Sequence, residues 1–200
     1  MNRAAYDSIV SDWDDARTQL SVHERRLLEQ TLEPAEPGSA ILDLGCGSGR
    51  PIGEYLLGRG FLLTGIDQSP RMLELARQRL PRGQWVECSL EAFTPQGRYG
   101  ATVAWDSLFH IPREHHMTIF KRVRNVLRSG SRFALTVGGS EHAAFTDTMF
   151  GQQFFYDSHP PDKAIALLGE AGFEITHSEF LDLPTSGRDK GRFAIIASAA

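Results

Sequence analysis

The chain has 200 residues, of which 41% are hydrophobic and 23% charged, and its formal net charge at pH 7 is −4. This length accommodates one domain with its own core, and the lack of a polybasic run disfavours a nucleic-acid partner. No apolar run in the sequence approaches the roughly 18 residues of a membrane span, and Met1–Asp7 lacks the apolar segment of a secretory signal. Two cysteines do not make a disulfide framework. We therefore expect a single cytoplasmic domain over residues 1–200 with no membrane partner.

Apolar periodicity, capping residues and glycine or proline breaks divide the chain into alternating helices and strands. Helical spacings lie at 4–20, 21–33, 51–57, 70–80, 114–127 and 162–171, and Ser21 with Glu24 predicts a capping box at the start of the second helix. Short apolar runs typical of strands lie at 40–44, 61–66, 84–88, 101–105, 132–137, 173–183 and 192–198. This order predicts an α/β fold: a doubly wound, mostly parallel seven-stranded sheet with an antiparallel C-terminal hairpin strand and helices on both faces.

The segment 45–51, Gly-Cys-Gly-Ser-Gly-Arg-Pro, follows the first strand and begins the next helix. Its three glycines allow positive φ and let backbone N–H groups approach a ligand without an intervening Cβ. Asp67 ends the second strand about twenty residues further on, where a carboxylate can accept both hydroxyls of a ribose. The combination predicts a nucleoside site at the carboxyl edge of a parallel sheet.

The spacing of these glycines differs from the G-x-G-x-x-G of dinucleotide-binding folds, which disfavours a nicotinamide-dependent oxidoreductase. Asp43 precedes them, so the pattern is D-x-G-x-G-x-G, and it resembles motif I of the class I (Rossmann-like) S-adenosylmethionine-dependent methyltransferases. The resemblance implies S-adenosyl-L-methionine as cofactor. It also implies contacts to that cofactor from several positions: Asp43, Gly45, Cys46, Gly47, Gly49, Asp67, Gln68, Ser89, Leu90 and Asp106. Ser89 departs from the family, which usually has an acid after the third strand to bind the adenine amino group. Cys46 has no neighbouring cation in the sequence to activate its thiol, so we do not expect it to be a nucleophile.

The N-terminal helices, residues 1–33, present an aromatic and basic trio: Tyr6, Trp13 and Arg17. In one interpretation Trp13 packs the helix on the sheet and the other two lie at the surface. In the other, which the family resemblance favours, this segment is a helical lid whose aromatic and arginine side chains contact a sulfonium and a carboxylate.

Three residues are candidates for proton transfer to or from an acceptor: His110, His159 and Tyr156. His110 follows the fourth strand at the ligand-binding edge of the sheet, and its imidazole titrates near neutral pH. The other two lie in a long aromatic stretch, 138–161, which we predict to be an irregular loop that covers the substrate. Structural roles, in a strand–helix turn or in filling the core, are the alternatives for all three. His115 and His116 cannot both share a helix face with His110, and we expect no metal site.

These features predict transfer of a methyl group to an oxygen or nitrogen of a small-molecule acceptor. The Asp106–His110 run resembles the small-molecule branch of the family and lacks the Pro-Pro-aromatic motif of DNA methyltransferases. The alternative is a non-catalytic S-adenosylmethionine-binding sensor or scaffold module. A carboxylate acceptor would need no general base. We expect a monomer or homodimer.

Overall fold

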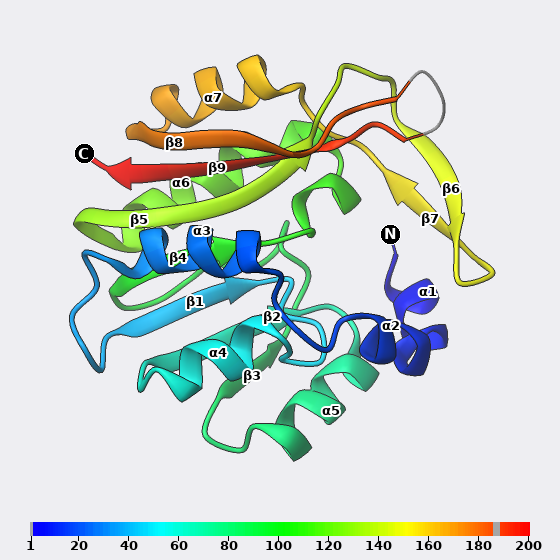
Figure 1. Ribbon diagram of the computed structural model, residues 1–200, viewed down its shortest axis with the longest axis horizontal. Helices are drawn as coiled ribbons and strands as arrows, with labels where there is room; N and C mark the ends of the chain where they lie inside the picture. The colour runs from blue at the N-terminus through cyan, green and yellow to red at the C-terminus, as the bar shows by residue number, and fades with distance from the viewer. Residues whose placement is uncertain (1, 186–188) are drawn as a thin grey trace.

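The computed structural model describes residues 2–185 and 189–200, and a seven-stranded sheet lies at its centre (Figure 1). The strand order is β3-β2-β1-β4-β5-β9-β8. β9 is antiparallel to both of its neighbours, β5 and β8, and the other pairings are parallel. The strands of this sheet are β1 (Ala40–Leu44), β2 (Leu62–Asp67), β3 (Gln84–Glu87), β4 (Tyr99–Ala104), β5 (Leu127–Gly138), β8 (Phe173–Asp182) and β9 (Arg192–Ala199). The predicted doubly wound sheet with an antiparallel C-terminal hairpin strand is confirmed.

Helices cover both faces of the sheet and form two apolar layers. Leu27 and Leu28 of α3 join α4 residues over one face, whereas Phe120 of α6 and Leu168 of α7 lie over the other. The helices are α3 (Val22–Leu32), α4 (Ile52–Gly58), α5 (Pro70–Arg79), α6 (His116–Val126) and α7 (Pro161–Glu170), with 3-10 turns at Leu108–His110 and Arg113–His115. Among the described residues, no helix combines the length and apolar character needed to cross a bilayer.

The N-terminal segment forms two short helices, α1 (Arg3–Ser8) and α2 (Val10–Ala16), rather than the single helix predicted over 4–20. Ile9 interrupts the helix because its φ and ψ, −105° and 14°, are not helical, while its side chain is buried. Figure 1 shows α1 and α2 near the end of the sheet to which β1 and β2 point. The predicted capping box of α3 is present: the Glu24 backbone N–H donates to Ser21 Oγ, and the Ser21 N–H donates to the Glu24 carboxylate. α3 itself packs on the sheet, whereas α1 and α2 lie at the ligand-binding edge.

The predicted irregular loop at 138–161 contains a β-hairpin, so that expectation was wrong. Its strands are β6 (Phe145–Met149) and β7 (Gln152–Tyr156), which pair antiparallel with Met149 opposite Gln152. Phe150 and Gly151 form the two-residue turn, and both have positive φ, at 48° and 75°. Two positive φ values are the geometry of a type I′ turn, whose twist suits a tight hairpin. The hairpin lies beyond the carboxyl end of β5, on the same side of the molecule as α1 (Figure 1).

Candidate functional site

The glycine turn after β1 is held in place by hydrogen bonds to the end of β2. The N–H groups of Gly45 and Cys46 both donate to the Ile66 carbonyl, at 2.8 and 3.0 Å. The Gly47 N–H donates to Asp67 Oδ2 at 2.9 Å. At Gly45, φ is +81°, and an added Cβ would lie 2.4 Å from the Cβ of Ser107. Only glycine fits there, because the turn passes directly against the chain that leaves β4.

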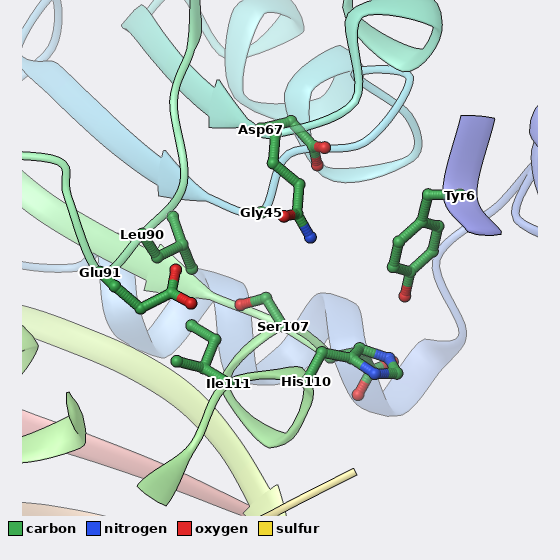
Figure 2. A pocket seen from close by; sticks show the side chains of 10 residues that line it. Tyr6, Gly45, Asp67, Leu90, Glu91, Ser107, His110 and Ile111 are labelled. Carbon is green, nitrogen blue, oxygen red and sulfur yellow. The ribbon is translucent and has the colours of Figure 1, made fainter. Parts of the chain in front are cut away.

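A cavity of about 60 Å³ lies above this turn, at the carboxyl ends of the first, second and fourth strands (Figure 2). Of the residues predicted to bind the cofactor or to transfer protons, seven line it: Tyr6, Gly45, Asp67, Gln68, Leu90, Asp106 and His110. Glu91, Ser107 and Ile111 complete the lining and were not predicted as site residues. Segments from five separate parts of the sequence therefore meet at one place.

Two carboxylates lie at and below the floor of the site. Asp67 is fixed by backbone donors on both oxygens, from Gly47 and from Ser69 at 2.9 Å, and it faces the cavity. Burial raises the pKa of Asp67, although those hydrogen bonds oppose the rise. Asp43 lies deeper and does not line the cavity, and burial together with the charge of Asp67 raises its pKa from 3.8 to about 7. A cation at this site would favour the ionised form of both groups.

The segment after β3 places Glu91, not Ser89, at the cavity. The Ser89 backbone carbonyl accepts from the N–H groups of Ala92 and Phe93, so Ser89 begins a tight turn. That turn brings Leu90 and Glu91 to the cavity wall, and Figure 2 shows both side chains on the same side of it. Glu91 could have been considered from the sequence, because it is an acid two residues beyond Ser89. The turn that directs it to the cavity has no distinctive sequence pattern.

The three residues of the predicted lid, Tyr6, Trp13 and Arg17, lie in different places in the structure. The Tyr6 ring reaches the cavity and packs edge-on against Trp13, 5.8 Å between centroids. Trp13 lies over the glycine turn, since a Cβ added at Gly47 would be 3.6 Å from its Nε1. Arg17 does not line the cavity: its guanidinium donates to Glu24 Oε1 at 3.0 Å. Whether these helices open and close stays a prediction.

A second cavity, of about 230 Å³, lies between the β6–β7 hairpin and the start of β9. Phe109, Phe145 and Tyr156 form an aromatic wall, in which the Tyr156 ring is stacked between the other two at centroid distances of 6.3 and 5.2 Å. Two contacts link this cavity to the first. The Tyr156 ring lies 4.7 Å from the His110 ring, and Arg192 Nη1 donates to Asp106 Oδ2 at 2.8 Å.

Comparisons with known proteins agree with this geometry. The family model described as "Methyltransferase domain" matches residues 41–130, which run from β1 through the start of β5. Over these residues the chain is similar to methyltransferase domains. It is 28% identical over 133 residues to 27-O-demethylrifamycin SV methyltransferase of Amycolatopsis mediterranei, covering 62% of this chain and 48% of that protein. It is 35% identical over 125 residues to trans-aconitate 2-methyltransferase of Rhizobium meliloti, covering 62% and 46%.

Solved structures share the methyltransferase fold along the whole chain. Magnesium protoporphyrin IX methyltransferase from Synechocystis PCC 6803, solved with bound SAM, superposes with a TM-score of 0.72. The superposition covers 99% of this chain and 95% of that one at 19% identity. By contrast, this chain spans about half the length of the first curated relatives that it matches.

Three further predicted residues lie off both cavities. His159 does not join His110, because its Nε2 lies 3.2 Å from the Arg113 carbonyl and its ring packs against His116. Cys46 is buried, and burial with the charges of Asp67 and Asp43 raises its thiol pKa, consistent with the expectation that it is not a nucleophile. Gly49 packs against α5 and Trp85. Over the described ranges, no group of three or more metal-ligating side chains is arranged to hold a metal ion.

Proposed function

We propose that this chain binds S-adenosyl-L-methionine in the first cavity and transfers its methyl group to an oxygen or nitrogen of a small molecule held in the second. The observation that carries the proposal is the linkage of the two cavities through the His110–Tyr156 and Asp106–Arg192 contacts. A nucleoside site alone would need only the first cavity. An aromatic-walled second cavity directly beside it provides a place for an acceptor.

The residues of the first cavity suit a nucleoside with a cationic amino-acid tail. Asp67 presents a carboxylate, already oriented by two backbone donors, for the ribose hydroxyls. Leu90 offers an apolar contact for a base, and Glu91 offers the acceptor for an exocyclic amine that Ser89 does not supply. Asp43 contributes negative charge beneath the glycine turn for an ammonium group. When bound, the cofactor supplies a methyl group on a sulfonium, which needs positioning more than covalent assistance.

The protein's own contribution to the transfer is orientation, exclusion of water and acceptance of a proton. Tyr6 and Phe154 enclose His110, with ring centroids 5.5 and 5.8 Å from it. Burial lowers the pKa of His110 from 6.5 to about 4, so the imidazole is neutral at pH 7 and has a lone pair for a proton from a hydroxyl or amine, although the same shift makes it a weaker base than an exposed imidazole. We therefore propose His110 as the general base, with Tyr156 positioning the acceptor from the second cavity. We do not propose His159 for this step.

Calorimetric titration with S-adenosylmethionine and S-adenosylhomocysteine tests the cofactor site. Incubation with isotopically labelled S-adenosylmethionine and a panel of small carboxylic acids, phenols and amines tests the transfer, with labelled product measured by mass spectrometry. We expect binding of both nucleosides and transfer to at least one class. Binding of neither nucleoside would contradict the whole proposal, whereas binding without turnover across the panel would support a non-catalytic binding module instead.

A further inference from the structure

Asn2 makes an unusually complete set of contacts for a residue so close to the chain's start. Its side chain is buried, with 3% exposed. Asn2 Oδ1 accepts from the Phe155 N–H at 2.9 Å, and Asn2 Nδ2 donates to the Phe155 carbonyl at 2.9 Å. The amide thus pairs with both polar backbone groups of one residue on the edge of β7 that β6 leaves open, where a neighbouring strand would otherwise be needed.

The same amide adjoins His110. Asn2 Nδ2 lies 3.0 Å from His110 Nδ1, and His110 Nδ1 lies 3.1 Å from the Phe155 carbonyl oxygen. Asn2 Nδ2, His110 Nδ1 and the Phe155 carbonyl oxygen therefore form a nearly equilateral triangle. The angle between the two N–H bonds of an amide nitrogen is wider than the angle at a corner of this triangle. Nδ2 therefore cannot donate well to both His110 Nδ1 and the Phe155 carbonyl.

One protonation state satisfies all three atoms. If His110 Nδ1 carries the proton, it donates to the Phe155 carbonyl, which has two lone pairs and also accepts from Asn2 Nδ2. The ring's other nitrogen, Nε2, has no partner among the described residues and is then an unprotonated acceptor. In the opposite tautomer, Nδ1 must compete with the Phe155 carbonyl for the amide hydrogens of Asn2.

We propose that Asn2 is a positioning residue: by pairing with both backbone polar groups of Phe155, it fixes the carbonyl that holds His110 in the Nδ1-protonated tautomer, with Nε2 left to accept a proton. This inference rests on the proposed function for its catalytic consequence. The chain after Asn2 continues directly into α1, which carries Tyr6 over the first cavity. At about 60 Å³ that cavity is well below the roughly 300–1,000 Å³ of ordinary ligand pockets, so part of its wall must move for a nucleoside to enter. If α1 is the part that moves, its return seats Asn2 and sets the base in the same step.

The titration of His110 can be interpreted simply, because the groups that contact its ring are neutral at pH 7. The titratable side chains whose rings contact it are Tyr6 on α1 and Tyr156 on β7, and burial raises the pKa of both phenols, so they are neutral at pH 7. No charged side chain forms a hydrogen bond with the imidazole in the described part of the chain.

Two-bond ¹H–¹⁵N spectra of the imidazoles test the inference without any need for turnover. The resonance of His110 is identified by its loss in His110→Gln. We expect the wild type to show the Nδ1-protonated pattern. In Asn2→Ala, the other tautomer should appear and the pKa of His110 should move back toward 6.5. In Asn2→Asp, which keeps an acceptor for the Phe155 N–H, a carboxylate beside Nδ1 should raise that pKa by about one pH unit or more.

Asn125→Ala is the matched control, because Asn125 is exposed and its backbone carbonyl, not its side chain, accepts from Arg98. Once a methyl acceptor that the protein turns over has been found, Asn2→Ala should lower kcat about tenfold or more and shift the acid limb of the pH profile of kcat. The affinity for S-adenosylmethionine should change less than kcat. An unchanged tautomer and pKa of His110 in both Asn2 variants would overturn the inference. If instead the wild type bound no cofactor or transferred no methyl group, the spectra would still decide the Asn2–His110 relationship separately from the proposed function.

Discussion

Asp14 on α2 and Arg79 at the end of α5 form a two-pronged ion pair, with Arg79 Nη1 3.0 Å from Asp14 Oδ1 and Nη2 2.8 Å from Oδ2. Ser48 and Arg50, from the segment that follows β1, donate to the same carboxylate. Burial alone would raise the pKa of Asp14, but the donors Arg79, Arg50 and Ser48 lower it from 3.8 to about 2. One carboxylate therefore fastens α2 both to the glycine turn and to the helix after β2.

Replacing Asp14 should loosen this attachment. Asp14→Asn keeps the shape but removes the charge that two arginines share, and we expect unfolding in urea to become easier by about 1–3 kcal/mol. Cofactor affinity should also fall, because Trp13 on the same helix lies over the turn at Gly47. Asp15→Asn is the control, since Asp15 is exposed on the same helix. Equal stability of the two variants would show that the ion pair does not stabilise α2.

Asp67→Ala tests the assignment of the ribose contact. Removal of a carboxylate that faces the cavity should weaken S-adenosylmethionine binding by about 1–3 kcal/mol, measured by calorimetry. Because Asp67 also accepts from the N–H groups of Gly47 and Ser69, the thermal unfolding midpoint must be measured in parallel. Asp12→Ala, at an exposed position on α2, should leave the affinity unchanged. Wild-type affinity in a folded Asp67→Ala protein would remove Asp67 from the cofactor site.

The elements that position this site were predictable because their signals are local. The apolar run at 40–44, the glycine spacing after it and the capping box of α3 each depend on residues within a few positions, and the structure contains all three. The β6–β7 hairpin escaped prediction because Phe150 occupies a positive-φ turn position that Asn or Asp normally fills, so no turn signal marked it.

The parts of the site that were missed depend on long-range contacts. Asn2 meets Phe155 across 153 positions, and Arg192 meets Asp106 across 86. Neither contact follows from periodicity, capping or spacing, because both depend on how separate elements pack at the edge of the sheet. Ser89 was predicted as a site residue and Glu91 was not, because the tight turn that brings Glu91 rather than Ser89 to the cavity wall has no local signal.

Glu91 and Ser89 form a natural pair of variants for the base-binding end of the cavity. Glu91→Gln should weaken S-adenosylmethionine binding several-fold, because an amide is a weaker acceptor for an exocyclic amine than a carboxylate. Ser89→Ala should change affinity little, since the Ser89 carbonyl, not its hydroxyl, makes the shorter contacts that hold the turn. Calorimetry with adenosine and with inosine sharpens the comparison, because only adenosine has the amine. A larger loss in Ser89→Ala than in Glu91→Gln would restore the original assignment.

His116 should make the fold sensitive to acid. It is fully buried on α6, its Nε2 contacts the Leu108 carbonyl at 3.0 Å, and burial lowers its pKa from 6.5 to about 4. Between pH 4 and pH 6.5, His116 binds a proton in the unfolded chain but not in the folded protein. The contribution of neutral His116 to the free energy of unfolding is therefore present above pH 6.5 and is lost as the pH falls toward 4. Relative to pH 7.5, the loss at pH 5 is about 2 kcal/mol.

Urea denaturation at several pH values between 7.5 and 5 measures this loss as a difference between variants. His116→Gln should lose less stability over that range than the wild type, even if it is less stable at pH 7.5, because glutamine does not titrate. His115→Gln should retain the wild-type pH dependence, since the adjacent His115 side chain is 44% exposed. Using the difference between variants also cancels the opposing contribution of Asp43, whose raised pKa favours the folded state as the pH falls. Parallel curves for the wild type and His116→Gln would mean that His116 titrates normally in the folded protein.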